Sequence, residues 1–320
     1  MTPPREQRTW SSTRVDVLLL CVALVWGSSY LAAKQLTEQA SVPAVLSIRF
    51  GIAALALLPL WWWKTRKLPS RAELIVGTIL GLSQASVLLL ETYGVAGTSA
   101  TNAGLIISLT VIFTPLLESA SNRAWLPPSF FIAATLAVVG VALLVSGNGF
   151  RAPNLGDLLM LGAAGVRAFH VTLMGRLTQR KPFSSFSITL IQTVVCVLVF
   201  SALDPSGLGS AIQNFQLPQW LGALYLGLAC SVFAFLVQLW AIRQTSPSRA
   251  SLLMGTEPVW AVLIGVTLGG ELLGWLGAAG AALIIGATYA GQRIETASRL
   301  RRAAKQRTEN APAEPSIPAV

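Results

Sequence analysis

The residues of this chain that could do chemistry lie inside apolar segments. Glu257 stands beside Pro258 within the apolar stretch 246–271, which is long enough to cross a bilayer. A carboxylate near the middle of a membrane helix costs about 2.5–3.5 kcal/mol on insertion scales, so its presence indicates a functional site. Pro258 removes the backbone hydrogen bond to the carbonyl of Met254 and predicts a kink in the helix at this position.

Arg167 and His170 form a second polar pair. They lie three residues apart in the apolar stretch 156–177, which places them on one face of a helix. A guanidinium in the membrane keeps its charge, so Arg167 is expected to pair with Glu257 or with a carboxylate on a substrate. His170, the single histidine, is a candidate proton relay because an unperturbed imidazole titrates near neutrality. A hydrogen-bonded structural role is the alternative for His170.

The composition indicates which class of protein positions these groups. Of the 320 residues, 53% are hydrophobic and 11% are charged, whereas soluble domains contain about 25% charged residues. The apolar segments are longer than barrel strands and do not alternate, so strands are not expected. We predict an all-α polytopic membrane protein with ten transmembrane helices, at residues 15–36, 43–63, 72–93, 98–118, 127–147, 156–177, 184–203, 219–242, 247–269 and 273–292.

Several classes of function are not indicated by the sequence. It contains no HExxH, Walker, GxGxxG or nucleophile-elbow motif. Cys21, Cys196 and Cys230 lie in apolar segments without CxxC spacing and are interpreted as packing residues. The net charge of +10 comes from basic residues in short loops and tails, which is not typical of a nucleic-acid-binding surface. We therefore expect no metal, no cofactor, no nucleic-acid partner and no enzymatic activity.

The distribution of basic residues predicts the orientation in the membrane. If the N-terminus is inside, the inner segments hold nineteen Lys and Arg residues, and the outer segments hold only Lys34 and Arg151. Both termini are therefore expected to be cytoplasmic, in a multi-pass protein of the cell (inner) membrane. Arg49 and Arg167 are the two basic residues that fall inside spans.

The chain contains a distant copy of itself. The segment that begins at Asp16 matches the segment that begins at Asp157, and Thr98-Ser99 matches Thr245-Ser246. Each half holds five spans, and because five is odd the second half must enter the membrane from the opposite face. Inverted repeats of this kind are typical of transporters, with the substrate site near the midplane.

The repeat also predicts the domain organisation. The two five-helix repeats are expected at residues 15–147 and 156–292, between a cytoplasmic N-terminal tail at 1–14 and a basic tail at 293–320 that is expected to be disordered.

The other candidate site residues follow from this arrangement. Arg49 either extends to the membrane interface or faces a cavity as an anion site. Glu91 and Gln238 hold equivalent positions in the two repeats and are candidate gating residues, with helix-end capping as the alternative. Polar and aromatic side chains inside the spans complete the predicted substrate-binding set: Trp26, Ser29, Tyr30, Gln84, Asn102, Gln192 and Trp260.

Four segments carry a resemblance to a known family. The sequences WGSSY at 26–30, Arg49, TSATNAG at 98–104 and TEPVWAVLIGVTLGGE at 256–271 resemble the EamA-type permeases of the drug/metabolite transporter superfamily. The resemblance extends from about residue 15 to residue 292. It implies ten helices in two inverted repeats and, most often, export of small metabolites, amino acids or drugs.

These observations predict a transporter that works by alternating access. We expect it to export a small molecule in exchange for protons, with Glu257 as the proton carrier and His170 as a relay. The alternatives are an uncoupled facilitator of the same substrates and a lipid flippase or lipid-processing membrane protein. The expected partners are the small-molecule substrate and the lipid bilayer, and the chain is expected to be a monomer or a homodimer.

Overall fold

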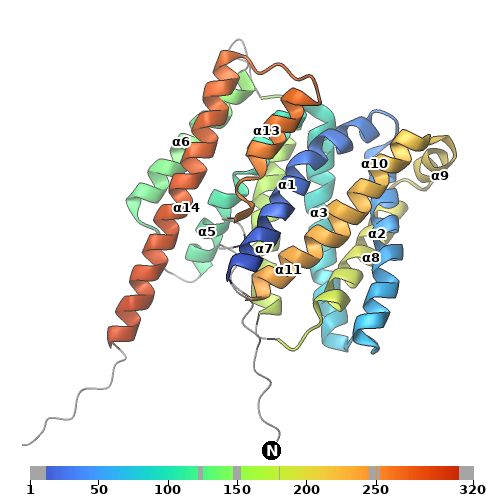
Figure 1. The fold of residues 1–320 in the computed structure, drawn as a ribbon, viewed down its shortest axis with the longest axis horizontal. Coiled ribbons are helices and arrows are strands. Elements are labelled where there is room, and N and C mark those ends of the chain that lie inside the picture. Colours follow the sequence, from blue (N-terminus) through green and yellow to red (C-terminus); the bar gives the residue numbers. More distant parts are fainter. Residues whose placement is uncertain are drawn as a thin grey trace, which may run out of the picture.

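The computed structural model describes residues 12–121, 125–146, 153–179, 181–244, 250 and 253–309. Within these residues the regular elements are helices, and no strand is present (Figure 1). They are α1 (Ser12–Thr37), α2 (Val42–Thr65), α3 (Arg71–Gly97), α4 (Ala100–Ile107), α5 (Thr110–Ser121), α6 (Pro128–Ser146), α7 (Leu155–Thr178), α8 (Ser185–Leu203), α9 (Pro205–Asn214), α10 (Leu217–Gly227), the π-helix η1 (Leu228–Phe233), α11 (Ala234–Gln244), α13 (Glu257–Thr267) and α14 (Trp275–Glu309).

Most of the predicted spans correspond to these helices. In the described part of the chain, seven helical stretches are long and apolar enough to cross a membrane: α1, α2, α3, α4 with α5, α7, α8, and the run from α10 through η1 to α11. The predicted spans at 127–147, 247–269 and 273–292 correspond to the shorter apolar helices α6 and α13 and to the first part of α14.

Local sequence signals explain where the long helices begin. Ser70 caps α3 and Asn154 caps α7, each by accepting a hydrogen bond from the backbone N–H three residues later. That third residue is Glu73 in α3 and Asp157 in α7, and its carboxylate accepts from the backbone N–H of the cap. These capping boxes satisfy donors that would otherwise lack partners at a helix start.

Two apolar helical stretches are interrupted by a short turn. One interruption, at Ser108 and Leu109, separates α4 from α5, and the hydroxyl of Ser108 donates to the carbonyl of Leu105 at 2.6 Å. The sequence predicted no interruption here, because a serine hydroxyl that competes for a helix carbonyl leaves little trace in the apolar pattern. In the other, Glu257 starts a new helix after a turn at Gly255 and Thr256.

The Glu257 helix start differs from the predicted kink at Pro258. Proline is unfavourable inside a helix because it lacks an N–H and its ring clashes with the preceding turn, but both problems vanish in the first turn. The chain therefore places Pro258 in the first turn of α13.

A π-helical segment interrupts the eighth predicted span, which the sequence predicted as continuous. In η1, the hydroxyl Oγ of Ser231 donates to the backbone carbonyl of Leu226, five residues earlier, at 3.0 Å. The carbonyl of Cys230 accepts a hydrogen bond from Trp26 Nε1 at 3.0 Å. π-Helical turns are frequent at functional sites because they redirect side chains within an otherwise regular helix.

Helix packing divides the molecule into a main bundle and a peripheral pair. Figure 1 shows α6 and α14 side by side, on the side of the molecule away from α2 and α8. In the bundle α2 packs against α8, α3 packs against α7 and α8, and α1 packs against α13. The polar residues that could form a site lie mainly in the bundle.

Hydrogen bonds at one end of the bundle join α1, α3 and α7. Lys34 Nζ, near the end of α1, donates to the carbonyl of Thr98 at 2.6 Å, and Thr98 Oγ1 donates to Asp157 Oδ1 at 2.7 Å. Here α3 and α7 touch through glycines, and a Cβ added to Gly156 would lie 2.5 Å from the carbonyl carbon of Gly97. This end is called the Thr98 face below.

The opposite end of the bundle joins α7 to α11 and α1. Gln179 Nε2, just after α7, donates to the carbonyl of Ile242 at 3.1 Å. Leu18, near the start of α1, shares an apolar groove with Trp240 of α11. α1 therefore starts at the end where α7 finishes, and the two helices run antiparallel. This end is called the Gln179 face.

The C-terminal helix is longer than the sequence predicted. α14 continues to Glu309, so residues 293–309 of the expected disordered tail are helical. This segment contains no Gly or Pro and is rich in Arg and Ala, which favour helix. Residues 310–320 lie outside the described part of the chain, as do residues 1–11 of the N-terminal tail.

Candidate functional site

A polar cavity lies in the middle of the bundle. It is lined by side chains of α1, α2, α3, α7 and α11. Its polar and charged lining includes eight of the predicted site residues: Trp26, Ser29, Arg49, Gln84, Glu91, Arg167, His170 and Gln238. Its apolar wall consists of Val87, Leu88, Val171 and Phe235. We call this space the central cavity.

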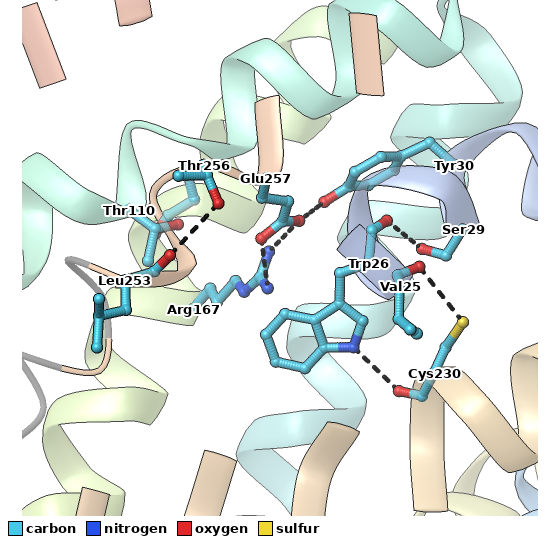
Figure 2. Close-up of polar contacts among 11 residues, drawn as sticks. Val25, Trp26, Ser29, Tyr30, Thr110, Arg167, Cys230, Leu253, Thr256 and Glu257 are labelled. Carbon is cyan, nitrogen blue, oxygen red and sulfur yellow. Dashed lines mark hydrogen bonds and ion pairs between the residues drawn. The ribbon is translucent and has the colours of Figure 1, made fainter. Parts of the chain in front are cut away.

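A buried ion pair adjoins the central cavity (Figure 2). Arg167 Nη1 and Nη2 each donate to one carboxylate oxygen of Glu257, both at 3.2 Å. The hydroxyl of Tyr30 donates to the same carboxylate. The exposed fractions of the Arg167 and Glu257 side chains are only 11% and 7%, so water shields this charge pair very little.

The aromatic ring of Trp26 completes the surroundings of the guanidinium. The guanidinium carbon of Arg167 lies 4.5 Å from the centre of this ring, within the range of a cation–π contact. Trp26 is itself held by its hydrogen bond to the carbonyl of Cys230 (Figure 2). Three elements distant in sequence, namely α1, α7 and α13, therefore converge on one carboxylate.

A second cavity also adjoins this ion pair. It is lined by both helix interruptions, with Ser108 and Thr110 from one and Gly255 and Glu257 from the other. Arg167, Val171 and Gln238 line both cavities. Arg167 thus lines both cavities, and its partner Glu257 lines the second. A movement of these two side chains would change the connection between the cavities.

Two further charged residues face the central cavity from neighbouring helices. Arg49 of α2 is 5% exposed, and its Nε donates to Ser231 Oγ at 2.9 Å. Glu91 of α3 is half-buried. Within the described part of the chain neither residue forms an ion pair, and the carboxylate of Glu91 accepts no hydrogen bond.

His170 presents one ring nitrogen without a partner. Its Nδ1 lies 2.7 Å from Ser83 Oγ, whose hydroxyl hydrogen is directed to the carbonyl of Leu80. Nδ1 must therefore carry the hydrogen of that contact, which leaves Nε2 as an acceptor. Nε2 is buried and has no hydrogen-bond partner among the described residues.

Comparison with known proteins assigns the chain to a family. A model of the EamA-like transporter family matches it twice, at residues 13–146 and at residues 154–290. The chain belongs to the EamA-like transporter family. The family resemblance that the sequence motifs predicted is therefore confirmed, and this EamA-like transporter is a multi-pass membrane protein that transports a small molecule.

Curated relatives of the EamA-like transporter are also named as transporters. An uncharacterized transporter of Archaeoglobus fulgidus is 27% identical over 265 residues, which cover 81% of this chain and 79% of the relative. The uncharacterized inner membrane transporter YedA of Escherichia coli K12 is 25% identical, with 80% and 83% covered. The uncharacterized transporter YetK of Bacillus subtilis is 26% identical, with 85% of each covered. A crystal structure of a protein that is 17% identical superposes with a TM-score of 0.61 over 87% of this chain and 98% of the other, which supports the fold.

Five predicted site residues of the EamA-like transporter lie outside the central cavity. Two of them, Tyr30 and Glu257, adjoin the cavity through Arg167. Arg167 donates to the carboxylate of Glu257, and Tyr30 donates to the same carboxylate. Asn102 lies in the first turn of α4, where its backbone N–H donates to Ser99 Oγ at 3.0 Å. Gln192 belongs to α8 and lies beside Gly81 of α3. Trp260 of α13 packs against Gly27 of α1. Asn102, Gln192 and Trp260 line neither of the two cavities.

Three residues of the site were not predicted from the sequence. Ser231 supports Arg49, Ser83 holds His170, and Phe235 forms part of the apolar wall. Ser231 and Ser83 are hydroxyl residues inside apolar spans, a signal that was present in the sequence. Phe235 had no such signal, because phenylalanines in membrane helices most often pack against other helices.

Proposed function

We propose that this EamA-like transporter exports a small polar or amphipathic molecule across the inner membrane by alternating access, in exchange for protons. The observation that carries the proposal is the buried Arg167–Glu257 pair, whose arginine lines both cavities. The name of the relative YedA supports the inner membrane as its location. Both cavities are lined by one chain, so we propose that a single chain is the transporting unit, whether it occurs as a monomer or as a homodimer.

We propose ten transmembrane helices in two inverted repeats, at residues 15–147 and 156–292. The antiparallel course of α1 and α7 supports this arrangement, because these helices start the two repeats. The helix contacts also support it: α2 packs against α8, α4 against α13 and α6 against α14, so equivalent helices of the two halves meet. The two matches to the family model, at residues 13–146 and 154–290, have nearly the same bounds as the two proposed repeats.

The Lys and Arg distribution supports a cytoplasmic location for both termini, which makes the Thr98 face the outer one. A reporter fused after Ser210 should therefore report the periplasm, and one fused after Lys67 should report the cytoplasm. Activity of paired periplasmic and cytoplasmic reporters in cells measures this directly. A cytoplasmic reading at residue 210 would contradict both the orientation and the inverted repeat.

The chemistry of proton exchange is assigned to Glu257. In the described conformation its carboxylate is stabilised as an anion by the guanidinium of Arg167 and the hydroxyl of Tyr30. A movement that separates Arg167 from Glu257 would leave a charged carboxylate without its counter-ion inside the membrane, and proton uptake removes that cost. Reformation of the pair would then expel the proton. Because Arg167 lines both cavities, we propose that the two steps face opposite sides of the membrane.

Two cavity residues are assigned supporting roles. We propose that His170 relays protons, since its Nε2 is an acceptor at the central cavity. Gln238 lines both cavities, so a change in its rotamer would alter their connection, which suits a gate. Glu91, its equivalent in the first repeat, lines the central cavity from α3 and is the other proposed gating residue.

Transport by the reconstituted wild-type protein tests the proposal. A compound that raises the thermal stability of the purified protein identifies a ligand, because binding to the folded state alone stabilises it. Efflux of that compound from proteoliposomes should accelerate when the receiving side is made acidic. With one proton per substrate, each pH unit can support a concentration ratio of about tenfold. Efflux that is indifferent to the gradient would overturn proton exchange and favour an uncoupled facilitator.

A further inference from the structure

A carboxylate at the Thr98 face links the two halves of the chain. Glu271, in the segment between α13 and α14, accepts hydrogen bonds from the backbone N–H groups of Ala100 at 2.7 Å and Thr101 at 2.9 Å. These are the first two residues of α4, which lies in the first of the two segments that match the family model, whereas Glu271 lies in the second. N–H groups at a helix start have no partner within the helix, and the helix dipole favours an anion there. Glu271 therefore fastens the start of α4 to the end of α13.

The bodies of α4 and α13 are in equally close contact. A Cβ added to Gly104 of α4 would lie 2.1 Å from the Cβ of Ala261 in α13, and a Cβ added to Gly265 of α13 would lie 2.4 Å from Thr101 Oγ1. These distances leave no room for a side chain at either glycine, so the two helices touch through bare backbone. Residues 100–107 and 257–267, joined by Glu271, are called the α4–α13 unit below.

The other end of the α4–α13 unit reaches the buried ion pair. α4 finishes beside the interruption at Ser108, α13 starts at Glu257, and both residues line the second cavity. Figure 2 shows Arg167 approaching Glu257 from a different helix, α7. Glu257 therefore belongs to the unit and Arg167 does not. A displacement of the unit relative to α7 would change the distance between the two charges.

We propose that Glu271 is a positioning residue, which holds α4 and α13 together and thereby sets Glu257 against Arg167. This role rests on the proposed function and ties the Thr98 face to proton exchange at Glu257. While Glu271 joins the helices, a movement at that face carries Glu257 with it. In the internal repeat Trp125, which is 76% exposed, stands opposite Glu271. The repeat itself therefore does not require a carboxylate at this position.

Transport by Glu271 variants tests the proposal. Glutamine offers one acceptor oxygen in place of two, and its NH₂ group would face a backbone donor. Glu271→Gln should therefore lower the ratio of gradient-driven efflux to counterflow about tenfold or more. Glu271→Asp keeps both oxygens and should stay within about threefold of the wild type, and Glu38→Gln should not change the ratio. Unfolding reduces both activities equally, so a merely structural role would leave the ratio unchanged. That result in Glu271→Gln would overturn the proposal.

A steric substitution should have the same effect without removing the charge. The methyl group of Gly265→Ala would lie 2.4 Å from Thr101 Oγ1 and 2.8 Å from Glu271 Oε2, so it should push the carboxylate off the start of α4. The ratio should again fall about tenfold. Gly286→Ala is the matched control, because a Cβ at that position of α14 meets no atom within 4 Å. Equal ratios for the two alanine variants would contradict the role of the contact.

A disulfide can replace the hydrogen bonds. In a protein whose three native cysteines are changed to alanine, Thr101→Cys/Gly265→Cys places two sulfurs within bonding reach. The reduced protein should show the loss expected for Gly265→Ala. Oxidation should restore the ratio to within about threefold of the cysteine-free parent, also in the presence of Glu271→Gln. Failure of the disulfide to form, or arrest of transport once it forms, would show that α4 and α13 do not act as one unit.

A measurement that needs no transport separates this inference from the proposed function. The coupling between Arg167 and Glu257, taken from a double-mutant cycle on unfolding, should fall by more than half in the Glu271→Gln background. Undiminished coupling would overturn the positioning role and leave proton exchange standing. Reduced coupling in a protein whose wild-type efflux ignores the pH gradient would support the positioning role and overturn proton exchange.

Discussion

Glu257→Gln is expected to lower the free energy of unfolding by about 3–5 kcal/mol, because it leaves the guanidinium of Arg167 buried without a counter-ion. The loss should exceed that of Arg167→Gln. Arginine cannot release its proton, whereas a carboxylate that has lost its partner can take one up and become neutral. Tyr30 would still donate a hydrogen bond to the remaining carboxyl group in Arg167→Gln.

The double variant Arg167→Gln/Glu257→Gln should recover much of the loss, because no charge then remains without a counter-ion. Unfolding of the four proteins in detergent, followed by denaturant or heat, closes the double-mutant cycle. Glu38→Gln, at an exposed acid, provides the control and should be neutral within about 0.5 kcal/mol. Losses that simply add in the double variant would show that the two side chains act separately, against the contact in the structure.

The second large effect concerns coupling. Glu257→Gln should abolish the acceleration of substrate efflux by a pH gradient while it retains counterflow exchange, in which substrate moves without net proton transfer. Glutamine keeps the shape and the hydrogen-bonding capacity of the side chain but cannot exchange a proton at neutral pH. Efflux and counterflow would be measured in the same proteoliposomes, with and without the gradient.

Reduced stability of the single variant could lower both activities, so the double variant Arg167→Gln/Glu257→Gln is measured beside it. Glu38→Gln should retain the full response to the gradient. A Glu257→Gln protein that still responds to the gradient would contradict the assignment of Glu257 as the carrier. If His170→Gln keeps the response to the gradient and Glu257→Gln loses it, His170 is not a proton relay. The assignment of Glu257 as the carrier would then stand.

Most of the apolar spans, the family and most of the cavity-lining residues could be predicted from the sequence. Burial in a bilayer demands long apolar helices, and a charge inside such a helix is costly enough to stand out as Glu257, Arg167 and Arg49 do. Eight of the predicted side chains line the central cavity, because polar residues inside spans avoid lipid and turn toward the same interior.

The interruptions and the pairing of charges were decided only by the tertiary structure. At the break between α4 and α5, the hydroxyl of Ser108 donates to a helix carbonyl, and in the π-helix η1 the hydroxyl of Ser231 does the same. The hydropathy of a segment does not record such local hydrogen bonds. The positions of Asn102, Gln192 and Trp260 away from the cavities also depend on how helices rotate against one another, which contacts between small residues determine.

The sequence left open whether Arg167 meets Glu257 or a substrate, and whether Arg49 faces the lipid interface or a cavity. Packing resolves both questions: α7 and α13 bring Arg167 and Glu257 to 3.2 Å, and Ser231 of the π-helix directs Arg49 inward. The sequence alone could place these charges at membrane depth, because hydrophobicity is a property of each segment. Which charges neutralise one another depends on distances between helices far apart in the chain, and those distances exist only after the helices have packed.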